Sequence, residues 1–330
     1  MTGPVLVTGA SGFVGRAVVA RLAAEGLAVR AAVRRHGVPF PANVSVVADA
    51  DLDRIDAWGD ALSGVGVVVH CAARAHRLAD DAADPLAAFR RANRDATGAL
   101  ARAAAAAGVA RFVFVSSIGV NGPETGERPF RADDVPAPAS PYAVSKREAE
   151  DELAAIAAER GLGVVVVRPP LVYGPDAPGN FATLLRAVDR GLPLPFGAID
   201  NRRSFVAIDN LVDLIAVLVR HPQAVGQTFL VSDGEDLSTS ELLRRTAAAL
   251  GRPARLIPVP PALLRRGLAL LGRAELAQRL CGSLVVDIGP TCARLGWRPP
   301  VGVDAALAAT AQRAPRLAER QRKAVTIPPR

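Results

Sequence analysis

The 330-residue sequence contains little lysine, tyrosine, cysteine or histidine. Among 40 basic residues the lysines are Lys146 and Lys323, and the two tyrosines are Tyr142 and Tyr173. The three cysteines and four histidines have neither disulfide nor metal-ligand spacing, so we expect no metal site and a reducing compartment. Apolar runs of about 18 residues are lacking, so we expect no membrane span. The N-terminus lacks the pattern of a signal peptide, and we expect a cytoplasmic protein.

The net charge of +8 is unevenly distributed along the chain. Residues 301–330 carry six basic and two acidic side chains, so +4 of the charge lies in the last thirty residues. The remainder is only mildly basic, which argues against a nucleic-acid-binding protein. We expect residues 313–330 to form a flexible basic tail.

Short apolar runs alternate with Ala-rich segments of helical composition in the first half of the chain. The runs are apolar almost throughout, as in strands that are covered on both faces of a parallel sheet. We expect strands at 4–10, 27–33, 44–48, 65–72, 111–117 and 163–169. We expect helices at 13–25, 53–63, 85–107 and 141–160, with Ser140 as an N-cap and Gly26, Gly108 and Gly161 as C-terminal caps. This βαβ pattern predicts an α/β fold with a doubly wound parallel sheet of the Rossmann type.

The pattern changes after Pro169, where segments rich in proline and glycine separate further helical patterns. We expect those helices at 180–190, 209–220, 238–250, 261–280 and 303–313. The large sheet domain is expected to comprise 1–168 plus about 204–222. A smaller C-terminal domain, which we expect to bind the substrate, would comprise about 169–203 plus 223–312.

The stretch VLVTGASGFVG places three glycines directly after the first expected strand, where the first expected helix opens. Glycine there permits a tight turn and the close approach of a pyrophosphate, which the amides at the helix N-terminus hold. A glycine turn without a ligand is the alternative, because such a triplet alone is weak evidence. We therefore expect a dinucleotide in the large domain, in contact with Gly9, Ser11, Gly12, Phe13, Val14 and Gly15.

The second expected strand ends in AAVRRHG, which has no acidic residue. A site selective for NAD usually has an acid near this point for the ribose hydroxyls, whereas arginines suit the 2′-phosphate of NADP. Arg34 and Arg35 therefore favour NADP over NAD. The alternative is that both arginines are solvated residues of a loop.

The segment SPYAVSK places one scarce lysine four residues after one scarce tyrosine. Tyr142 and Lys146 then share one helix face, and a position that keeps lysine among so many arginines indicates a need for a compact charge. A nearby ammonium, together with an oxidised nicotinamide, would lower the phenol pKa from about 10. Tyr142 could then exchange a proton with an alcohol–ketone pair. Ser117, at the C-terminal edge of the sheet, could hold the carbonyl oxygen.

Four segments, TGASGFVG, SSIGVNG, YAVSK and RPPLVYGP, together resemble the extended short-chain dehydrogenase/reductase family of nucleotide-sugar epimerases, dehydratases and reductases. The resemblance covers about residues 3–300. It implies a catalytic triad of Ser117, Tyr142 and Lys146, in which Lys146 also bonds the nicotinamide ribose. The further cofactor contacts that it implies are Asp49, Ala50, Ala72, Ala73, Arg74, Asn93 and Pro169.

The resemblance also extends to the substrate side. The segment NRRSFVAIDN resembles the family stretch whose arginine grips a nucleotide diphosphate, here Arg203. The other implied substrate contacts are Ser117, Asn121, Asn180, Phe196 and, as a second phosphate ligand, Arg279. Ordinary surface arginines and loop packing are the alternative for this set.

Sugar 4,6-dehydratases of this family carry an Asp-Glu pair where this sequence has Ile118 and Gly119, so dehydration is not expected. The resemblance favours an NADP(H)-dependent 4-reductase of a UDP-4-keto-6-deoxy-N-acetylhexosamine in surface polysaccharide biosynthesis. An NAD-dependent UDP-hexose 4-epimerase, a reductase of another carbonyl and a non-catalytic NADP-binding sensor stay open. The resemblance also implies a homodimer through helices 85–107 and 141–160.

Overall fold

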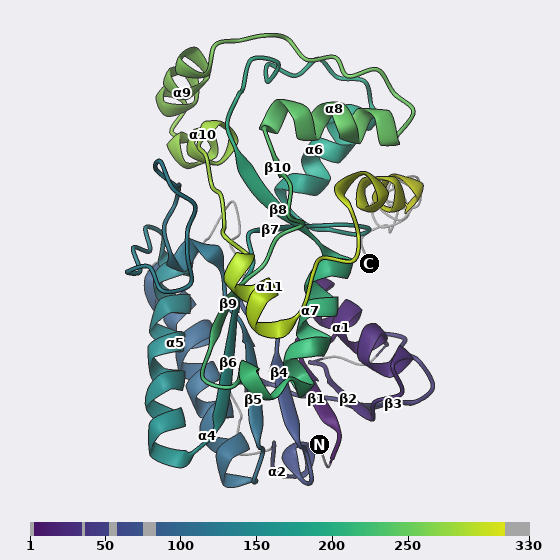
Figure 1. Ribbon diagram of the computed structural model, residues 1–330, viewed down its shortest axis with the longest axis vertical. Coiled ribbons are helices and arrows are strands. Elements are labelled where there is room, and N and C mark those ends of the chain that lie inside the picture. Colours follow the sequence, from purple (N-terminus) through teal and green to yellow (C-terminus); the bar gives the residue numbers. More distant parts are fainter. Residues whose placement is uncertain (1–2, 35–36, 53–57, 75–83, 314–330) are drawn as a thin grey trace, which may run out of the picture.

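The computed structural model describes residues 3–34, 37–52, 58–74 and 84–313 (Figure 1). The expectations for Arg35 and for a tail beyond residue 313 lie outside these residues. Seven strands form one parallel sheet in the order β3-β2-β1-β4-β5-β6-β9. They are β1 (Val5–Thr8), β2 (Val29–Ala32), β3 (Val44–Val47), β4 (Val67–His70), β5 (Arg111–Val115), β6 (Gly163–Arg168) and β9 (Thr228–Leu230). The predicted doubly wound sheet is confirmed, and β1 to β6 lie within the six predicted runs.

Both faces of this sheet are covered by helices, which explains why its inner strands are apolar almost throughout. On one face, α1 (Phe13–Ala24) and α7 (Ile208–Arg220) pack with β1 in a single apolar cluster. On the other face lie α2 (Gly59–Leu62), α4 (Ala96–Ala106) and α5 (Pro141–Arg160) (Figure 1). Every residue of β1, β4 and β6 is buried.

The expected helix at 85–107 contains an irregular segment. Helix α3 (Pro85–Phe89) leads into a π-helical segment, η2 (Arg90–Asp95), and then into α4. π-Helical segments are rare and are frequent at functional sites. A π-helical turn contains an extra residue relative to an α-helical turn. This segment carries Asn93, whose side chain is fully buried.

The chain after β6 builds a smaller region around a three-stranded sheet. Its strands are β7 (Leu171–Tyr173), β8 (Arg203–Ala207) and β10 (Asp236–Leu237), in the order β10-β8-β7. Its helices are α6 (Asn180–Asp189), α8 (Thr239–Ala249), α9 (Pro261–Leu270), α10 (Ala274–Cys281) and a helix at 303–313. Helix α11 (Gly289–Leu295) packs instead on the large sheet, because Leu295 belongs to the cluster of α1 and α7. None of the described helices is long and apolar enough to cross a bilayer.

Two expectations for this region are wrong. Strand β9 pairs with β6, so residues 228–230 join the large sheet although the sequence placed them in the smaller domain. The expected helix at 261–280 is two helices, because α9 ends at Leu270 and Gly272 adopts φ +70°. A positive φ there reverses the chain as helix-terminating glycines do.

Candidate active site

The glycine turn between β1 and α1 leaves no room for side chains. Gly9 has φ +64°, and the Gly12 amide donates to the Gly9 carbonyl at 2.8 Å. A β-carbon at Gly9 would lie 2.7 Å from the Ala72 nitrogen, and one at Gly15 would lie 2.2 Å from the Gly9 oxygen. The turn thus brings the N-terminus of α1 against the residues that follow β4. Backbone amides at such a helix N-terminus fit the pyrophosphate of a dinucleotide.

A buried histidine joins β1 and β4 beneath this turn. His70 is fully buried, with Nδ1 2.7 Å from Thr8 Oγ1 and Nε2 3.0 Å from Thr97 Oγ1. Thr97 donates its own proton to the Asn93 carbonyl, so His70 Nε2 donates and Nδ1 accepts. Burial, together with the Lys146 charge, lowers the pKa of His70 to about 3. This imidazole is neutral and structural.

Hydrogen bonds of the Asn93 side chain connect the loop after β4 to the helix that carries Tyr142. Its amide exchanges two hydrogen bonds with the Arg74 backbone, at 2.8 and 3.1 Å. Its nitrogen also donates to Ser145 Oγ at 3.0 Å, and Ser145 donates to the Tyr142 carbonyl at 2.7 Å. The hydrogen bonds of Asn93 therefore fix the position of the Arg74 segment relative to α5. Both segments carry expected cofactor contacts.

The first turns of α5 lie against the end of β5, where Ser117 begins the short helix η3 (Ile118–Val120). A β-carbon added at Gly119 would lie 3.3 Å from Ala143 Cβ and 3.4 Å from Ser117 Oγ. Ser117 therefore adjoins the residue next to Tyr142. Its Oγ accepts from the Gly119 amide at 3.1 Å, which leaves the hydroxyl proton for another acceptor.

Lys146 is buried, and its ammonium is engaged within the protein. Lys146 Nζ donates to the Val115 carbonyl at 2.9 Å and lies 4.5 Å from the centre of the Phe114 ring. The Tyr142 ring packs edge-on against Phe89, with 6.0 Å between the ring centres. The structure thus brings all three triad candidates to the C-terminal end of β5.

The pKa values of the pair differ from the sequence-based expectation. Burial raises the pKa of Tyr142 to about 12 rather than lowering it. Burial also lowers the pKa of Lys146 to about 8, against the opposing charge of Glu150. The physical reason is that the ammonium points to the Val115 carbonyl, so desolvation of the phenol is not offset. The protein alone therefore holds Tyr142 as a neutral phenol.

A buried ion pair that the sequence reasoning missed lies directly behind the triad. Glu150 accepts from Arg168 Nε at 3.0 Å and Nη2 at 2.6 Å, and from Ser116 Oγ at 2.5 Å. Arg168 Nη1 also donates to the Asn121 side chain at 2.9 Å. The signal was present in the sequence, because Glu150 follows Lys146 by four residues and hence shares its inward face.

Asn121 belongs to this buried network. Its side chain is 2% exposed, and its nitrogen donates to the Arg131 carbonyl at 2.7 Å. Both ends of the amide are thus used by the protein. Asn121 was expected to contact the substrate. Its side chain lies instead in the buried network beneath the candidate site.

The other expected cofactor residues lie around the ends of the strands. Arg34 follows β2 and is exposed, and so is Asp49, which has φ +55°. The Ala50 amide donates to the Val33 carbonyl at 3.0 Å, which holds this loop against β2. The Pro169 carbonyl accepts from the Ile118 amide at 3.0 Å, next to Ser117. Ser11 is exposed, whereas Phe13, Val14 and Ala72 are half-buried and Ala73 is exposed.

The expected substrate residues occupy the smaller region. Arg203 opens β8 and donates to the Gly282 carbonyl at 2.7 Å. Burial and the nearby Arg279 charge lower the pKa of Arg203 to about 10, while Glu124 opposes this. The structure therefore brings the two arginines together. Phe196 is half-buried in a cluster with Leu243, and Asn180 begins α6.

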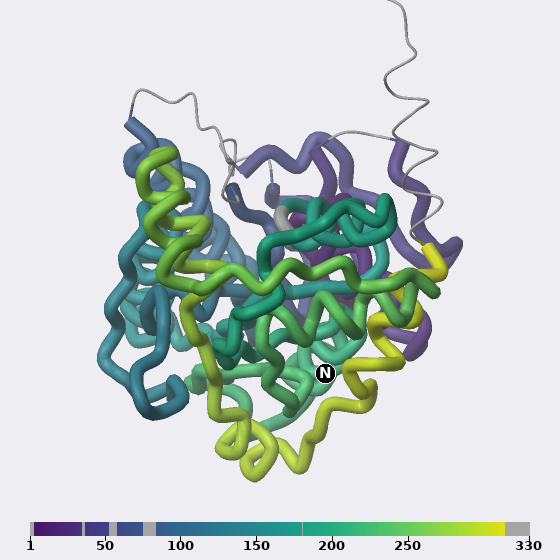
Figure 2. The backbone as a smooth tube through the Cα atoms, turned by 90° about the horizontal axis from the view of Figure 1, so that it is seen from above, coloured from purple at the N-terminus to yellow at the C-terminus, as the bar shows by residue number. Residues whose placement is uncertain are grey.

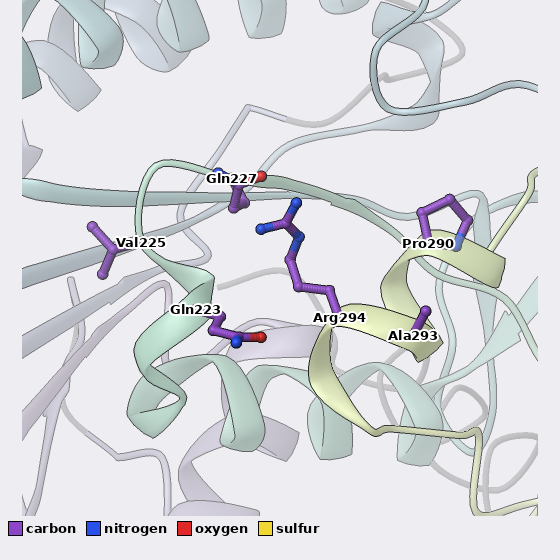
Figure 3. Close-up of a pocket in the computed structure, with 6 residues that line it drawn as sticks. All are labelled: Gln223, Val225, Gln227, Pro290, Ala293 and Arg294. Atoms are coloured by element: carbon purple, nitrogen blue, oxygen red, sulfur yellow. The ribbon is translucent and has the colours of Figure 1, made fainter.

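A pocket of about 630 Å³ lies elsewhere, between helix α11 and the turn η4 (Pro222–Ala224) before β9 (Figure 3). Figure 3 shows Arg294 reaching from α11 toward Gln227, while Gln223 lies on η4. The pocket contains none of the predicted site residues, so it is not the candidate active site. Among the described residues, no three histidine, cysteine or acidic side chains gather as a metal site requires.

Residues 5–232 match the model of the NAD dependent epimerase/dehydratase family. The chain belongs to this family. It is an NAD(P)-dependent enzyme of the extended short-chain dehydrogenase/reductase type, as the motifs predicted. Within the family the chain is similar to both nucleotide-sugar epimerases and reductases.

The relatives represent two kinds of reaction. A UDP-glucose 4-epimerase of Vibrio cholerae is 43% identical over 310 residues, which cover 93% of this chain and 94% of that protein. A ceramide reductase of Caulobacter vibrioides is 33% identical over 271 residues, covering 80% and 76%. The solved structure of MoeE5 in complex with UDP-glucuronic acid and NAD is 28% identical, with a TM-score of 0.75, and covers 96% of this chain and all of that one (100%).

Proposed function

We propose that the protein is an NADPH-dependent reductase of the 4-keto group of a UDP-linked sugar, a UDP-4-keto-6-deoxy-N-acetylhexosamine, in surface polysaccharide biosynthesis. The observation that carries the choice of reduction is Arg34, exposed at the end of β2 where an NAD site would place an acid. A guanidinium there suits the 2′-phosphate of NADP, the cofactor that serves reductions.

Tyr142 and Ser117 carry the proton chemistry in this proposal. Tyr142 would give its phenolic proton to the carbonyl oxygen, while NADPH, when bound, would supply the hydride to the carbonyl carbon. The high pKa of Tyr142 supports this direction, because a neutral phenol is the form that a reduction needs at its start. Ser117 would donate a hydrogen bond to the same oxygen, since its Oγ already accepts from Gly119. Lys146 would hold the nicotinamide ribose.

Arg203 and Arg279 are proposed to hold the diphosphate of the substrate. Burial and the nearby Arg279 charge lower the pKa of Arg203, and an anion between the two guanidinium groups would offset both effects. MoeE5, whose structure is in complex with UDP-glucuronic acid and NAD, supports a UDP-linked substrate for this chain. We also propose a homodimer through the outer faces of α4 and α5, and a cytoplasmic location.

The second candidate is an NAD-dependent UDP-hexose 4-epimerase, which the 43% identity to the Vibrio cholerae enzyme favours. Its cycle begins with removal of a proton from the C4 hydroxyl, so Tyr142 would have to ionise first. Tight retention of the oxidised cofactor would be required. Dehydration is not proposed, because Ile118 and Gly119 offer no carboxylates.

The test combines cofactor identification with turnover. Mass spectrometry of the purified protein would identify a co-purified dinucleotide, and absorbance at the NADPH band would follow reduction of a 4-keto sugar nucleotide. We expect NADPH oxidation that requires the keto sugar, and a weaker response to NADH. Arg34→Asp should reverse that cofactor preference, with Arg16→Asp on α1 as a control. Interconversion of UDP-hexoses without added cofactor would establish the epimerase instead.

A further inference from the structure

Helix α9 exposes an apolar surface that the protein leaves uncovered. None of the residues Pro261–Leu270 is buried. Leu270 is 89% exposed, Leu271 73% and Leu263 57%. Single exposed leucines are ordinary, whereas several on one short helix mark an interaction surface.

The exposed side of α9 combines these leucines with arginine. Leu263 and Leu270 are seven residues apart and lie on the same side of the helix. Arg266 is three residues after Leu263 and four before Leu270, so it lies between them, and Arg273 follows Leu271. Helix α9 stands at one end of the molecule in Figure 1 and at its outer edge in Figure 2. The other end of the molecule holds the N-terminal ends of the main strands.

The segment of the chain that contains α9 carries charge of one sign. Between Glu241 and Glu275 the chain has no acidic residue, and it has the arginines Arg244, Arg245, Arg252, Arg255, Arg265, Arg266 and Arg273. Three of them pair with acids outside this stretch or at its edge, since Arg244 and Arg245 bond Glu241 and Arg252 lies near Asp189. Within the described chain, no acidic side chain pairs with Arg255, Arg266 or Arg273.

We propose that α9 docks the protein on the surface of an anionic lipid bilayer. An interfacial helix needs apolar side chains for the acyl boundary and basic ones for the headgroups, and α9 presents both on one side. A second copy of this chain fits poorly, because a symmetric contact would place the arginines of two α9 helices against one another. The basic residues 314–330 would be repelled for the same reason. The proposal does not depend on which reaction the active site performs.

The experiment is co-sedimentation of the full chain with vesicles of phosphatidylcholine alone and of phosphatidylcholine with phosphatidylglycerol. We expect at least about tenfold stronger partition onto the anionic vesicles, and loss of that preference at high salt. Leu270→Ser/Leu271→Ser should lower the partition about tenfold, and Arg266→Ser/Arg273→Ser should remove the salt dependence. Leu192→Ser, which changes an exposed leucine on another segment, is the matched control and should bind as the wild type does.

Three results would overturn the proposal. One is equal partition onto both kinds of vesicle, and another is unchanged partition of the double leucine variant. The third is concentration-dependent self-association in light scattering that the leucine variant abolishes, which would assign the surface to a second copy. Melting curves of the variants that match the wild type would ensure that altered binding does not reflect misfolding.

Discussion

Glu150→Gln removes one charge from the ion pair behind the triad and keeps the volume of the side chain. The side chains of Arg168 and Glu150 are 4% and 6% exposed, so the guanidinium would stay buried without a counter-charge. Removing one partner of a buried pair costs about 3–5 kcal/mol of unfolding free energy. For a chain of this size, we expect a melting temperature lower by roughly 5–10 °C.

The same variant should change the active site in a way that folding alone does not. Burial lowers the pKa of Lys146 to about 8, and the Glu150 charge opposes that shift. Without Glu150 the ammonium is lost at a lower pH. Since the charged form exists below the pKa, the alkaline decline of NADPH affinity should move to lower pH in the variant. Fluorescence titration of NADPH at a series of pH values measures this without a sugar substrate.

The matched control is Glu148→Gln on the same helix. Glu148 pairs with Arg90 at 2.6 Å, but their side chains are 25% and 41% exposed. Exposed pairs contribute about 0–1 kcal/mol, so the control should melt close to the wild type and keep its pH profile. Equal melting temperatures of the two variants would contradict the role of the buried pair in stability, and an unchanged alkaline decline in the Glu150 variant would contradict its effect on Lys146.

Three other changes test the remaining parts of the site. Gly15→Ala should weaken NADPH binding at least about tenfold in a fluorescence titration, because its β-carbon meets the Gly9 carbonyl, while Gly59→Ala meets nothing within 4 Å and should bind normally. Tyr142→Phe should abolish turnover in the NADPH absorbance assay and keep the cofactor affinity; retained turnover would remove Tyr142 from the chemistry. His70→Gln should flatten the acid side of the stability curve in urea denaturation. In the unfolded chain His70 binds a proton below about pH 6.5, whereas in the folded protein it stays neutral down to about pH 3. The wild type therefore loses up to about 1.4 kcal/mol of unfolding free energy per pH unit between these values.

Helix α5 shows which parts of the fold the sequence predicts well. Its bounds, Pro141–Arg160, coincide with the prediction because both ends are set locally. Ser140 accepts from the Ala143 amide at 3.2 Å, and Gly161 adopts the left-handed conformation at φ +69°. Strand β9 was missed because it is three residues long and owes its existence to pairing with β6, a contact between distant segments.

In the candidate site too, the sequence predicts the features that are set locally and misses those that depend on contacts between distant segments. The glycine turn and the spacing of Tyr142 and Lys146 are local patterns, and the structure places both at the same edge of the sheet. The Glu150–Arg168 pair and the burial of Asn121 depend on how α5 packs on β6 and on the segment after β5. The direction of the Tyr142 pKa shift could not be predicted, because it depends on where the Lys146 ammonium points.

Burial lowers the pKa of one cation in each of the two parts of the candidate site. It lowers the pKa of Lys146 to about 8 at the triad and that of Arg203 to about 10 on the substrate side. Each cation would be stabilised by an anionic or strongly polar ligand. The proposed ligands are the diphosphate of a nucleotide sugar for Arg203 and the nicotinamide ribose for Lys146, so binding would favour the charged forms that burial opposes. If Arg203 binds the diphosphate as proposed, burial of this cation in the free protein would favour ligands that carry phosphate.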